Sequence, residues 1–268
     1  MTTQKLSGEV AFVTGGGRGL GQAIAEALAN EGAAVAVAAR SEGEINTVAA
    51  DLEASGARAI AIACDVTDAA SINAAFTRAE QALGPVTILV NNAGVQGPLG
   101  PVGSIDAADW WSAQTVHVLG ALLCMTRALP AMQATGHGRI INIASQAGTF
   151  VAPNASAYAV AKASLIRLTE HVDAEQRGSA IRAFAIQPGT ILTEMSNRTL
   201  ASPNAREHAA PLVALLESVT PEASAQARKK LQMLAVDLAS GRFDALSGRY
   251  LDVDWDLPAL LAEQMQSA

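Results

Sequence analysis

The chain has 268 residues, of which 50% are apolar and 4% aromatic, and a formal net charge of -7 from 18 Lys and Arg against 25 Asp and Glu. This acidic balance, without a block of basic residues, argues against nucleic acid or an anionic membrane as the main partner. No run approaches the roughly 18 uninterrupted apolar residues of a membrane span, and the first residues do not resemble a signal peptide, so we expect a cytoplasmic protein. An α/β fold of this length commonly forms one core, so we expect residues 1–268 to be a single domain.

Short apolar runs alternate with longer Ala-rich stretches along most of the chain. Strands are predicted at 9–14, 34–39, 58–64, 86–91, 139–145 and 181–187, and helices between them at 19–31, 42–55, 68–83, 106–135 and 157–177. This alternation predicts an α/β fold of the Rossmann type, a doubly wound parallel sheet with helices on both faces.

The pattern is interrupted after the sixth strand. Turn residues and one short helix are predicted at about 189–221, a segment that we interpret as a lid over the strand ends. A helix at 222–239, a last strand at 247–254 and a polar tail complete the predicted order.

A glycine-rich turn follows the first predicted strand. It reads TGGGRGLG, residues 14–21, and leads into a helix. Such glycines permit a tight turn, close approach of a pyrophosphate and close packing of helix on strand, while the helix N-terminus offers free N–H groups. The turn therefore predicts a dinucleotide site formed by Thr14, Gly15, Gly17, Arg18, Gly19, Leu20 and Gly21.

The end of the second predicted strand bears on the choice of cofactor. An NAD site usually has an acidic residue there to bind the ribose 2'-hydroxyl, but this chain has Ala39 followed by Arg40. Arg40 and Arg18 could instead bind a 2'-phosphate, because a guanidinium matches phosphate geometry. We therefore expect NADP(H), with NAD(H) as the alternative if both arginines are ordinary surface residues.

The stretch SAYAVAK, residues 156–162, has a tyrosine and a lysine four positions apart. On a helix, Tyr158 and Lys162 would project from the same face. The simplest explanation is an ordinary amphipathic turn. A catalytic one is that the ammonium stabilises the phenolate: shifting a phenol pKa from about 10 toward neutrality needs roughly 3 to 4 kcal/mol, which a lysine and a positive nicotinamide ring could supply.

With these motifs the sequence resembles the short-chain dehydrogenase/reductase family. The resemblance spans about residues 5–253 and rests on TGGGRGLG, CDV (64–66), NNAG (91–94), Ser145, YAVAK (158–162) and PGTILT (188–193), in this order. It implies that Ser145 binds the substrate oxygen, that Tyr158 transfers the proton, and that Lys162 binds the nicotinamide ribose and assists Tyr158. It further implies cofactor contacts from Asp65, Val66, Asn91, Ala93, Tyr158, Lys162, Pro188, Gly189, Ile191 and Thr193.

One position departs from the family pattern. The family usually has an Asn in a VNxxG stretch, thought to hold a water that connects the lysine to solvent, whereas this chain reads VHVLG with His117 there. Because histidine donates and accepts hydrogen bonds, His117 could preserve this proton relay and is included among the catalytic residues. It could equally be a core histidine bonded to backbone.

Substrate contacts are predicted from loops that follow the motifs, at Gln96, Gln146, Phe150 and Met195. The histidines show no spacing typical of metal ligands, so no metal site is expected. The two cysteines, Cys64 and Cys124, are interpreted as free core thiols. Family members are commonly homotetramers, so we expect a tetramer, or a dimer, formed through the Ala-rich faces at 118–131 and 159–172.

The sequence thus predicts an NADP(H)-dependent oxidoreductase that interconverts a ketone or aldehyde and a secondary alcohol of modest size. Two alternatives stay open. One is a nucleotide-binding regulatory protein that has lost turnover, which only His117 favours. The other is an NAD-dependent alcohol dehydrogenase.

Overall fold

The predicted apolar runs form one parallel sheet in the computed structural model, which describes residues 4–266. The strands are β1 (Val10–Thr14), β2 (Ala34–Ala39), β3 (Ala59–Ala63), β4 (Ile88–Asn91), β5 (Gly138–Ile143), β6 (Ile181–Gln187) and β7 (Tyr250–Asp252). Their spatial order is β3-β2-β1-β4-β5-β6-β7, and each neighbouring pair is parallel. The chain crosses from one half of the sheet to the other between β3 and β4, which leaves a crevice at the carboxyl ends of β1 and β4.

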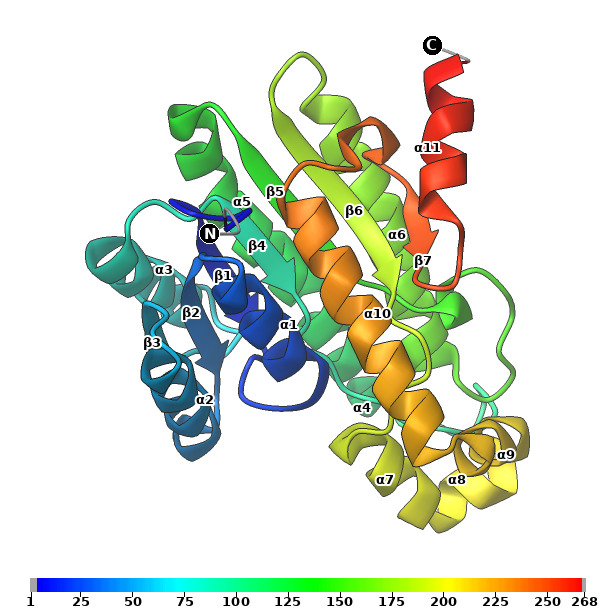
Figure 1. Ribbon diagram of the computed structural model, residues 1–268. Coiled ribbons are helices and arrows are strands. Elements are labelled where there is room, and N and C mark those ends of the chain that lie inside the picture. Colours follow the sequence, from blue (N-terminus) through cyan, green and yellow to red (C-terminus); the bar gives the residue numbers. More distant parts are fainter. Residues whose placement is uncertain (1–3, 267–268) are drawn as a thin grey trace.

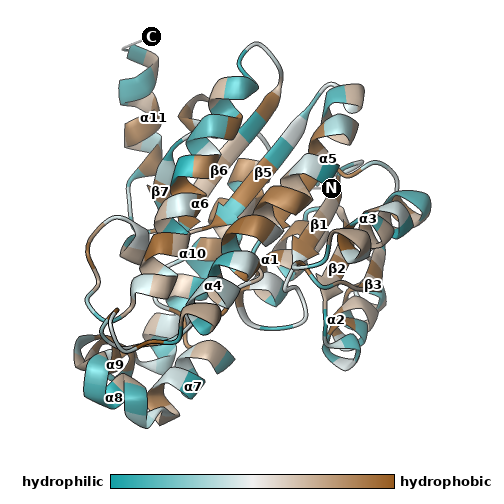
Figure 2. Cartoon of the chain, turned by 180° about the vertical axis from the view of Figure 1, so that it is seen from behind, coloured by the Kyte–Doolittle hydropathy of each residue, from teal (hydrophilic) through white to brown (hydrophobic). Residues whose placement is uncertain are grey.

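Both faces of the sheet are buried, because alternate strand residues enter two separate cores. In β1, Ala11 and Val13 pack on one side, while Val10 and Phe12 pack on the other. The first core is covered by α1 (Gly19–Asn30), α2 (Glu42–Ala54) and α10 (Pro221–Ala239). The second is covered by α3 (Ala69–Leu83), α5 (Gly120–Thr135) and α6 (Ser156–Glu175). These two layers, seen in Figures 1 and 2, are the predicted doubly wound arrangement.

The segment predicted as a lid contains three helices rather than one. They are α7 (Glu194–Ala201), α8 (Pro203–His208) and α9 (Ala210–Ser218), and they lie beyond the carboxyl ends of the strands (Figure 1). A third apolar cluster ties α8 and α9 to neighbouring loops through Leu99 and Ala155. The amide of Asn204 also donates to the Leu99 carbonyl at 2.6 Å. This segment is therefore anchored over the crevice.

The last residues also differ from the prediction. Instead of a polar tail, the chain forms α11 (Leu257–Gln266) after β7. Leu257 is buried, and Leu260 and Leu261 pack against the first core. Short 3-10 turns at Gln146–Gly148 and Asp244–Leu246 complete the elements.

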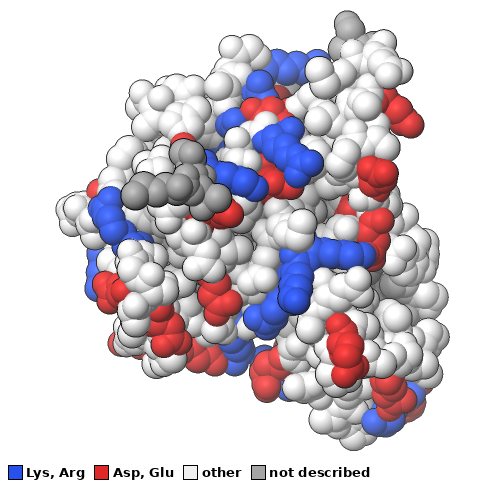
Figure 3. Space-filling model, viewed as in Figure 1, with Lys and Arg blue, Asp and Glu red and all other residues white. Residues whose placement is uncertain are grey.

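The long predicted helix at 106–135 is divided in three. It consists of α4 (Ala107–Gln114), a π-helical turn η1 (Thr115–Leu119) and α5. Within the described residues, Ala107–Thr135 is the one helical stretch whose length and apolar composition would allow it to cross a membrane, a test that core helices of α/β proteins also pass. On the face shown in Figure 3, basic and acidic side chains lie intermixed.

Candidate active site

The glycine turn between β1 and α1 is closed as tightly as the sequence predicts. Gly15 and Gly19 have φ angles of 62° and 58°, in the left-handed region that favours glycine. A Cβ on Gly21 would lie 2.2 Å from the Gly15 carbonyl oxygen. No side chain caps the start of α1, so its first N–H groups remain available to an anionic ligand.

This tight closure gives a first prediction. Replacing Gly21 with Ala should lower stability by about 1 to 3 kcal/mol, because the added methyl group forces the turn open, and it should weaken dinucleotide binding by roughly tenfold or more. Thermal unfolding and cofactor titration measure the two effects. The matched control is Gly43→Ala in α2, where a Cβ meets nothing within 4 Å and helix propensity favours Ala by up to about 1 kcal/mol. Equal behaviour of both variants would contradict this account.

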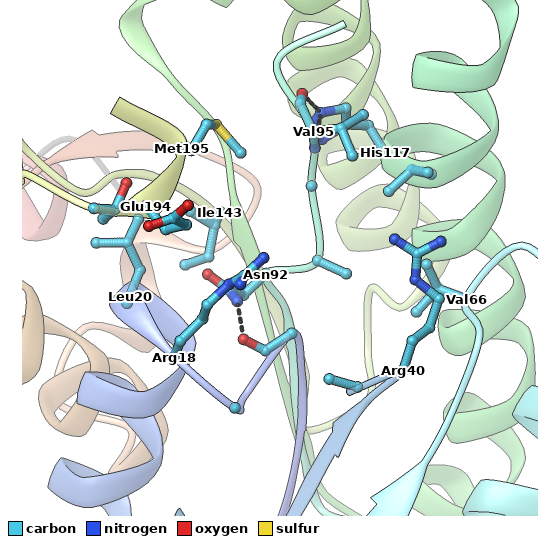
Figure 4. A pocket seen from close by; sticks show the side chains of 18 of the residues that line it. Arg18, Leu20, Arg40, Val66, Asn92, Val95, His117, Ile143, Glu194 and Met195 are labelled. Carbon is cyan, nitrogen blue, oxygen red and sulfur yellow. Dashed lines mark hydrogen bonds between the residues drawn. The ribbon is translucent and has the colours of Figure 1, made fainter. Parts of the chain in front are cut away.

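A hydrogen-bond network joins the glycine turn to the end of β4 (Figure 4). The amide of Asn92 donates to the carbonyls of Thr14 and Gly15 at 2.9 and 3.1 Å. The Thr14 hydroxyl donates to the Val90 carbonyl and accepts from the N–H groups of Asn92 and Ala93. Thr14 is only 2% exposed. Its role here is thus to fix the turn rather than to face the crevice.

Two arginines stand at the end of the crevice where the adenosine of a dinucleotide would lie. Arg18 is the residue before α1 and pairs with Glu44 of α2 at 2.9 Å. Arg40 follows β2 and extends into the cavity beside Val66 (Figure 4). Nearby, hydrogen bonds from Thr67 and the charge of Arg40 hold the pKa of the Asp65 carboxyl below its usual value.

Three side chains named by the family resemblance meet at the other end. Tyr158 and Lys162 lie on one face of α6, with the Lys162 ammonium 5.4 Å from the centre of the tyrosine ring. Ser145, two residues after the end of β5, lies beside Tyr158, and its hydroxyl favours the ionised form of the phenol. Lys162 is 4% exposed, and its ammonium donates to the Ile143 carbonyl at 2.6 Å. These contacts hold the phenol and the ammonium in one orientation at the cavity wall.

Burial changes the pKa values of this pair. Desolvation lowers the pKa of Lys162 to about 7. It raises the pKa of Tyr158, while the hydrogen bond with Ser145 acts in the opposite direction. The side chains present therefore raise the phenol pKa on balance. From the sequence we expected Lys162 to lower it. A positive nicotinamide ring beside the phenol would supply the stabilisation of the phenolate that these side chains do not.

His117 lies in the π-helical turn η1, 2% exposed, next to this pair. Its Nε2 is 2.7 Å from the Val95 carbonyl oxygen (Figure 4). Its ring meets the ring of Tyr158 edge-on, with the centroids 5.6 Å apart. Burial and the Lys162 ammonium lower the pKa of His117 to about 3. The histidine therefore contacts the backbone of Val95 and also touches the ring of Tyr158.

One cavity of about 250 Å³ runs through both ends of the crevice. Fifteen of the predicted residues line it, from all the motifs except the serine: Gly15, Gly17, Arg18, Gly19, Leu20, Arg40, Asp65, Val66, Ala93, His117, Tyr158, Lys162, Pro188, Thr193 and Met195. The others lie outside its lining: Thr14, Gly21, Asn91, Gln96, Ser145, Gln146, Phe150, Gly189 and Ile191. Of these, Asn91 is turned away from the cavity, because its amide donates to Asn142 at 2.8 Å, and Phe150 is 56% exposed.

Several lining residues were missed by the sequence prediction. Asn92 and Gly94 belong to the NNAG motif, which signalled the region but not which Asn faces the turn. Glu44, Glu194 and Arg198 have no sequence signal. Among the described residues, no group of three or more His, Cys, Asp and Glu could hold a metal ion. Cys64 and Cys124 are both buried and free, as predicted.

Comparison with known proteins identifies the chain. Residues 9–204 match the short chain dehydrogenase family. The chain is also 41% identical over 206 residues to 2-(S)-hydroxypropyl-CoM dehydrogenase 3 of Xanthobacter autotrophicus, which covers 76% of this chain and 80% of that protein. The chain belongs to the short-chain dehydrogenase family. The resemblance noted from its motifs is thereby confirmed.

Other relatives of this short-chain dehydrogenase agree. It is 35% identical over 244 residues to cis-4-hydroxycyclohexanecarboxylate dehydrogenase of Sinomonas cyclohexanicum, over 91% of this chain and 97% of that one. A candidate short-chain alcohol dehydrogenase from Sinorhizobium meliloti 1021 has the same fold, with a TM-score of 0.79 at 30% identity, covering 96% of this chain and 99% of that chain. The protein is thus an NAD(P)-dependent oxidoreductase acting on CH–OH groups, and the predicted fold and enzyme class are confirmed.

Proposed function

We propose that this short-chain dehydrogenase uses NADP(H) to interconvert a ketone or aldehyde and a secondary alcohol, with Tyr158 as general acid and base. The observation that carries the proposal is that Tyr158 and Lys162 line the same cavity as the glycine turn, with Ser145 beside Tyr158 just outside its lining. The relatives named above support a hydroxyl-bearing substrate, since one acts on a hydroxypropyl group and another on a hydroxycyclohexane.

The residues present fit a dinucleotide. The crowded Gly21 position and the uncapped start of α1 form a cradle of N–H donors for a pyrophosphate. Gly17, Gly19 and Leu20 would hold that group, and Asp65 and Val66 would flank the adenine. Pro188 and Thr193 would border the nicotinamide, whose chemistry when bound is to donate or accept a hydride.

The protein's own part is proton transfer and orientation. In the reducing direction the Tyr158 hydroxyl gives its proton to the substrate oxygen, and Ser145 orients that oxygen by a hydrogen bond. Lys162 stabilises the resulting phenolate through its charge and is held in place by the Ile143 carbonyl. In the oxidising direction the same groups act in reverse order.

The substrate end of the cavity has an apolar wall. Val95, Val116, Ile143 and Met195 line it, and we propose that α7 to α9, at about 189–221, act as the lid that completes it. We also keep Gln96, Gln146 and Phe150 as proposed substrate contacts, which a moving lid or a bound substrate could bring to the cavity. A ketone or aldehyde of modest size suits such a wall.

The proposed activity is tested by following NADPH oxidation and NADP+ reduction at 340 nm. The panel should pair neutral ketones and secondary alcohols with matched hydroxycarboxylates and their ketones, because one relative acts on a carboxylate. We expect turnover with at least one secondary alcohol and its ketone. Tight NADPH binding without turnover in either direction would instead favour the regulatory alternative.

We further propose a cytoplasmic homotetramer, with a dimer as the alternative. Exposed apolar side chains lie along one helical face, at Trp111, Leu119 and Leu122, and Val160 of α6 is also exposed. Such residues are typical of surfaces buried by a second copy. Light scattering of the purified protein should give a mass of four chains, and a monomer at micromolar concentration would contradict this proposal.

A further inference from the structure

The π-helical turn places His117 where an ordinary helix would not. η1 inserts a wider turn between α4 and α5, and single π turns are frequent at functional sites. Within it, His117 points inward against the loop after β4. A Cβ on Gly94 would lie 2.5 Å from His117 Cε1, so the imidazole fits only because position 94 is glycine. Gly94 and His117 are thus matched to each other.

The tautomer of His117 follows from its contact with Val95. Nε2 lies 2.7 Å from the Val95 carbonyl oxygen and 3.1 Å from the Val95 amide nitrogen, so it faces a backbone acceptor and a backbone donor. The shorter contact would bring two acceptors together unless a proton lies between them, so we assign the ring proton to Nε2, and the longer approach of the Val95 N–H is then not a hydrogen bond. A neutral imidazole carries only one N–H, so Nδ1 must then be an acceptor. Nδ1 is buried and has no hydrogen-bond partner among the described residues.

A second unpaired acceptor lies at the same place. Oδ1 of Asn91 is also buried and unpaired, while the amide nitrogen of that side chain is held by Asn142. Asn91 and His117 both line a small cavity of about 10 Å³, whose remaining walls include Gly120 and Leu165. One water molecule needs roughly that volume and at least two polar partners. Two acceptors suit the two protons of a water.

The charges around His117 oppose a second proton on the ring. The titratable groups facing it, Tyr158 and Lys162, both come from α6. The loop after β4 presents Gly94 and the Val95 backbone, and no described carboxylate contributes to the pKa of His117. Lys162 does not line the small cavity, and its ammonium is directed to the Ile143 carbonyl.

We propose that His117 is a neutral positioning residue: Nε2–H fixes the Val95 wall beside Tyr158, and Nδ1 shares one buried water molecule with Oδ1 of Asn91. His117 then exchanges no proton with Lys162, unlike the relay expected at this position from the family. The inference deepens the proposed reaction, and only its kinetic test rests on the proposed function.

The first test needs no turnover. Nitrogen-15 spectra of the histidine-labelled full chain, assigned with the His117→Asn variant, should show an Nε2–H imidazole for His117 that stays unchanged from pH 5 to 9. Exposed His171 marks the signal of a ring in contact with solvent. A high-resolution crystal structure should place a water within hydrogen-bond distance of His117 Nδ1 and Asn91 Oδ1. Titration of His117 in this range, an Nδ1–H tautomer or a dry cavity would overturn the proposal.

The second test separates positioning from proton relay. His117→Phe keeps a ring against Tyr158 but leaves the Val95 carbonyl and Asn91 Oδ1 without their partners, so kcat/KM should fall by about 5- to 100-fold. The pH at which kcat/KM changes should be the same in wild type, His117→Asn and His117→Phe, because neutral His117 does not titrate there. A shift of that pH in either variant would overturn the proposal in favour of a relay. If the wild type shows no turnover, that result contradicts the proposed function and not this inference. The nitrogen-15 spectra would still show whether His117 is neutral and which ring nitrogen carries the proton.

Discussion

Tyr158→Phe should lower kcat by at least about 10³-fold in both directions while the Kd for NADPH changes by less than about threefold. Loss of a positioned general acid and base typically costs 10² to 10⁴ in rate. Ser145 and the Lys162 ammonium both lie beside this phenol, so removing the hydroxyl takes away the group that both of them would act on. Rates at 340 nm and titration of NADPH by fluorescence measure the two effects.

The chain supplies a matched control for this substitution. Its only other tyrosine, Tyr250, lies in β7 against Trp255, and its buried hydroxyl has no partner among the described residues. Tyr250→Phe removes the same atom without leaving a partner unpaired, so activity and stability should stay near those of the wild type. If Tyr158→Phe behaved like Tyr250→Phe, the enzyme would not use this phenol, and the regulatory alternative would gain support.

The sheet could be predicted because its signal is local. A parallel sheet buried on both faces needs short, continuous apolar runs, and these stand out between Ala-rich helices, so that β2 was predicted at the residues that form it. Two of the three helices in the predicted lid, and α11, were missed because each is short. Their stability depends on distant contacts, such as that of Asn204 with Leu99, which the sequence does not reveal.

The position of the site could be predicted where a sequence motif fixes the backbone. Which side chains face the cavity was harder to predict, because this depends on the direction in which each side chain points. Successive strand residues point to opposite sides, so of the neighbours Asn91 and Asn92 only one can face the glycine turn. The fold sends Asn92 there and Asn91 toward Asn142. The sequence likewise shows no link between Arg18 and Glu44, which meet only when α1 packs beside α2.

The ion pair between Arg18 and Glu44 bears on the choice between NADP(H) and NAD(H), because charges of both signs lie at this end of the cavity. For Arg40 no ion pair is found among the described residues, so its guanidinium is available to a 2'-phosphate. Arg18 is shared with Glu44, whose carboxylate would also repel a phosphate at the same end of the cavity. Arg40 should therefore carry most of any preference for NADPH, and Glu44 should weaken it.

Arg40→Ala should reduce the NADPH-over-NADH ratio of kcat/KM by about 10- to 150-fold. This range corresponds to one or two charged hydrogen bonds of about 1.5 to 3 kcal/mol in total.

Glu44→Gln should raise the same ratio by about 2- to 5-fold, because the substitution releases Arg18 from a half-exposed ion pair. Arg78→Ala, at an exposed position of α3, removes the same charge outside the lining of the cavity and should leave the ratio unchanged. An unchanged ratio in Arg40→Ala would mean that the guanidinium does not bind a 2'-phosphate, and the NAD-dependent alternative would then hold. Opposite shifts in Arg40→Ala and Glu44→Gln, together with an unchanged ratio in Arg78→Ala, would indicate a phosphate close to Arg40 and Glu44, because a general effect of net charge would also shift the ratio in Arg78→Ala.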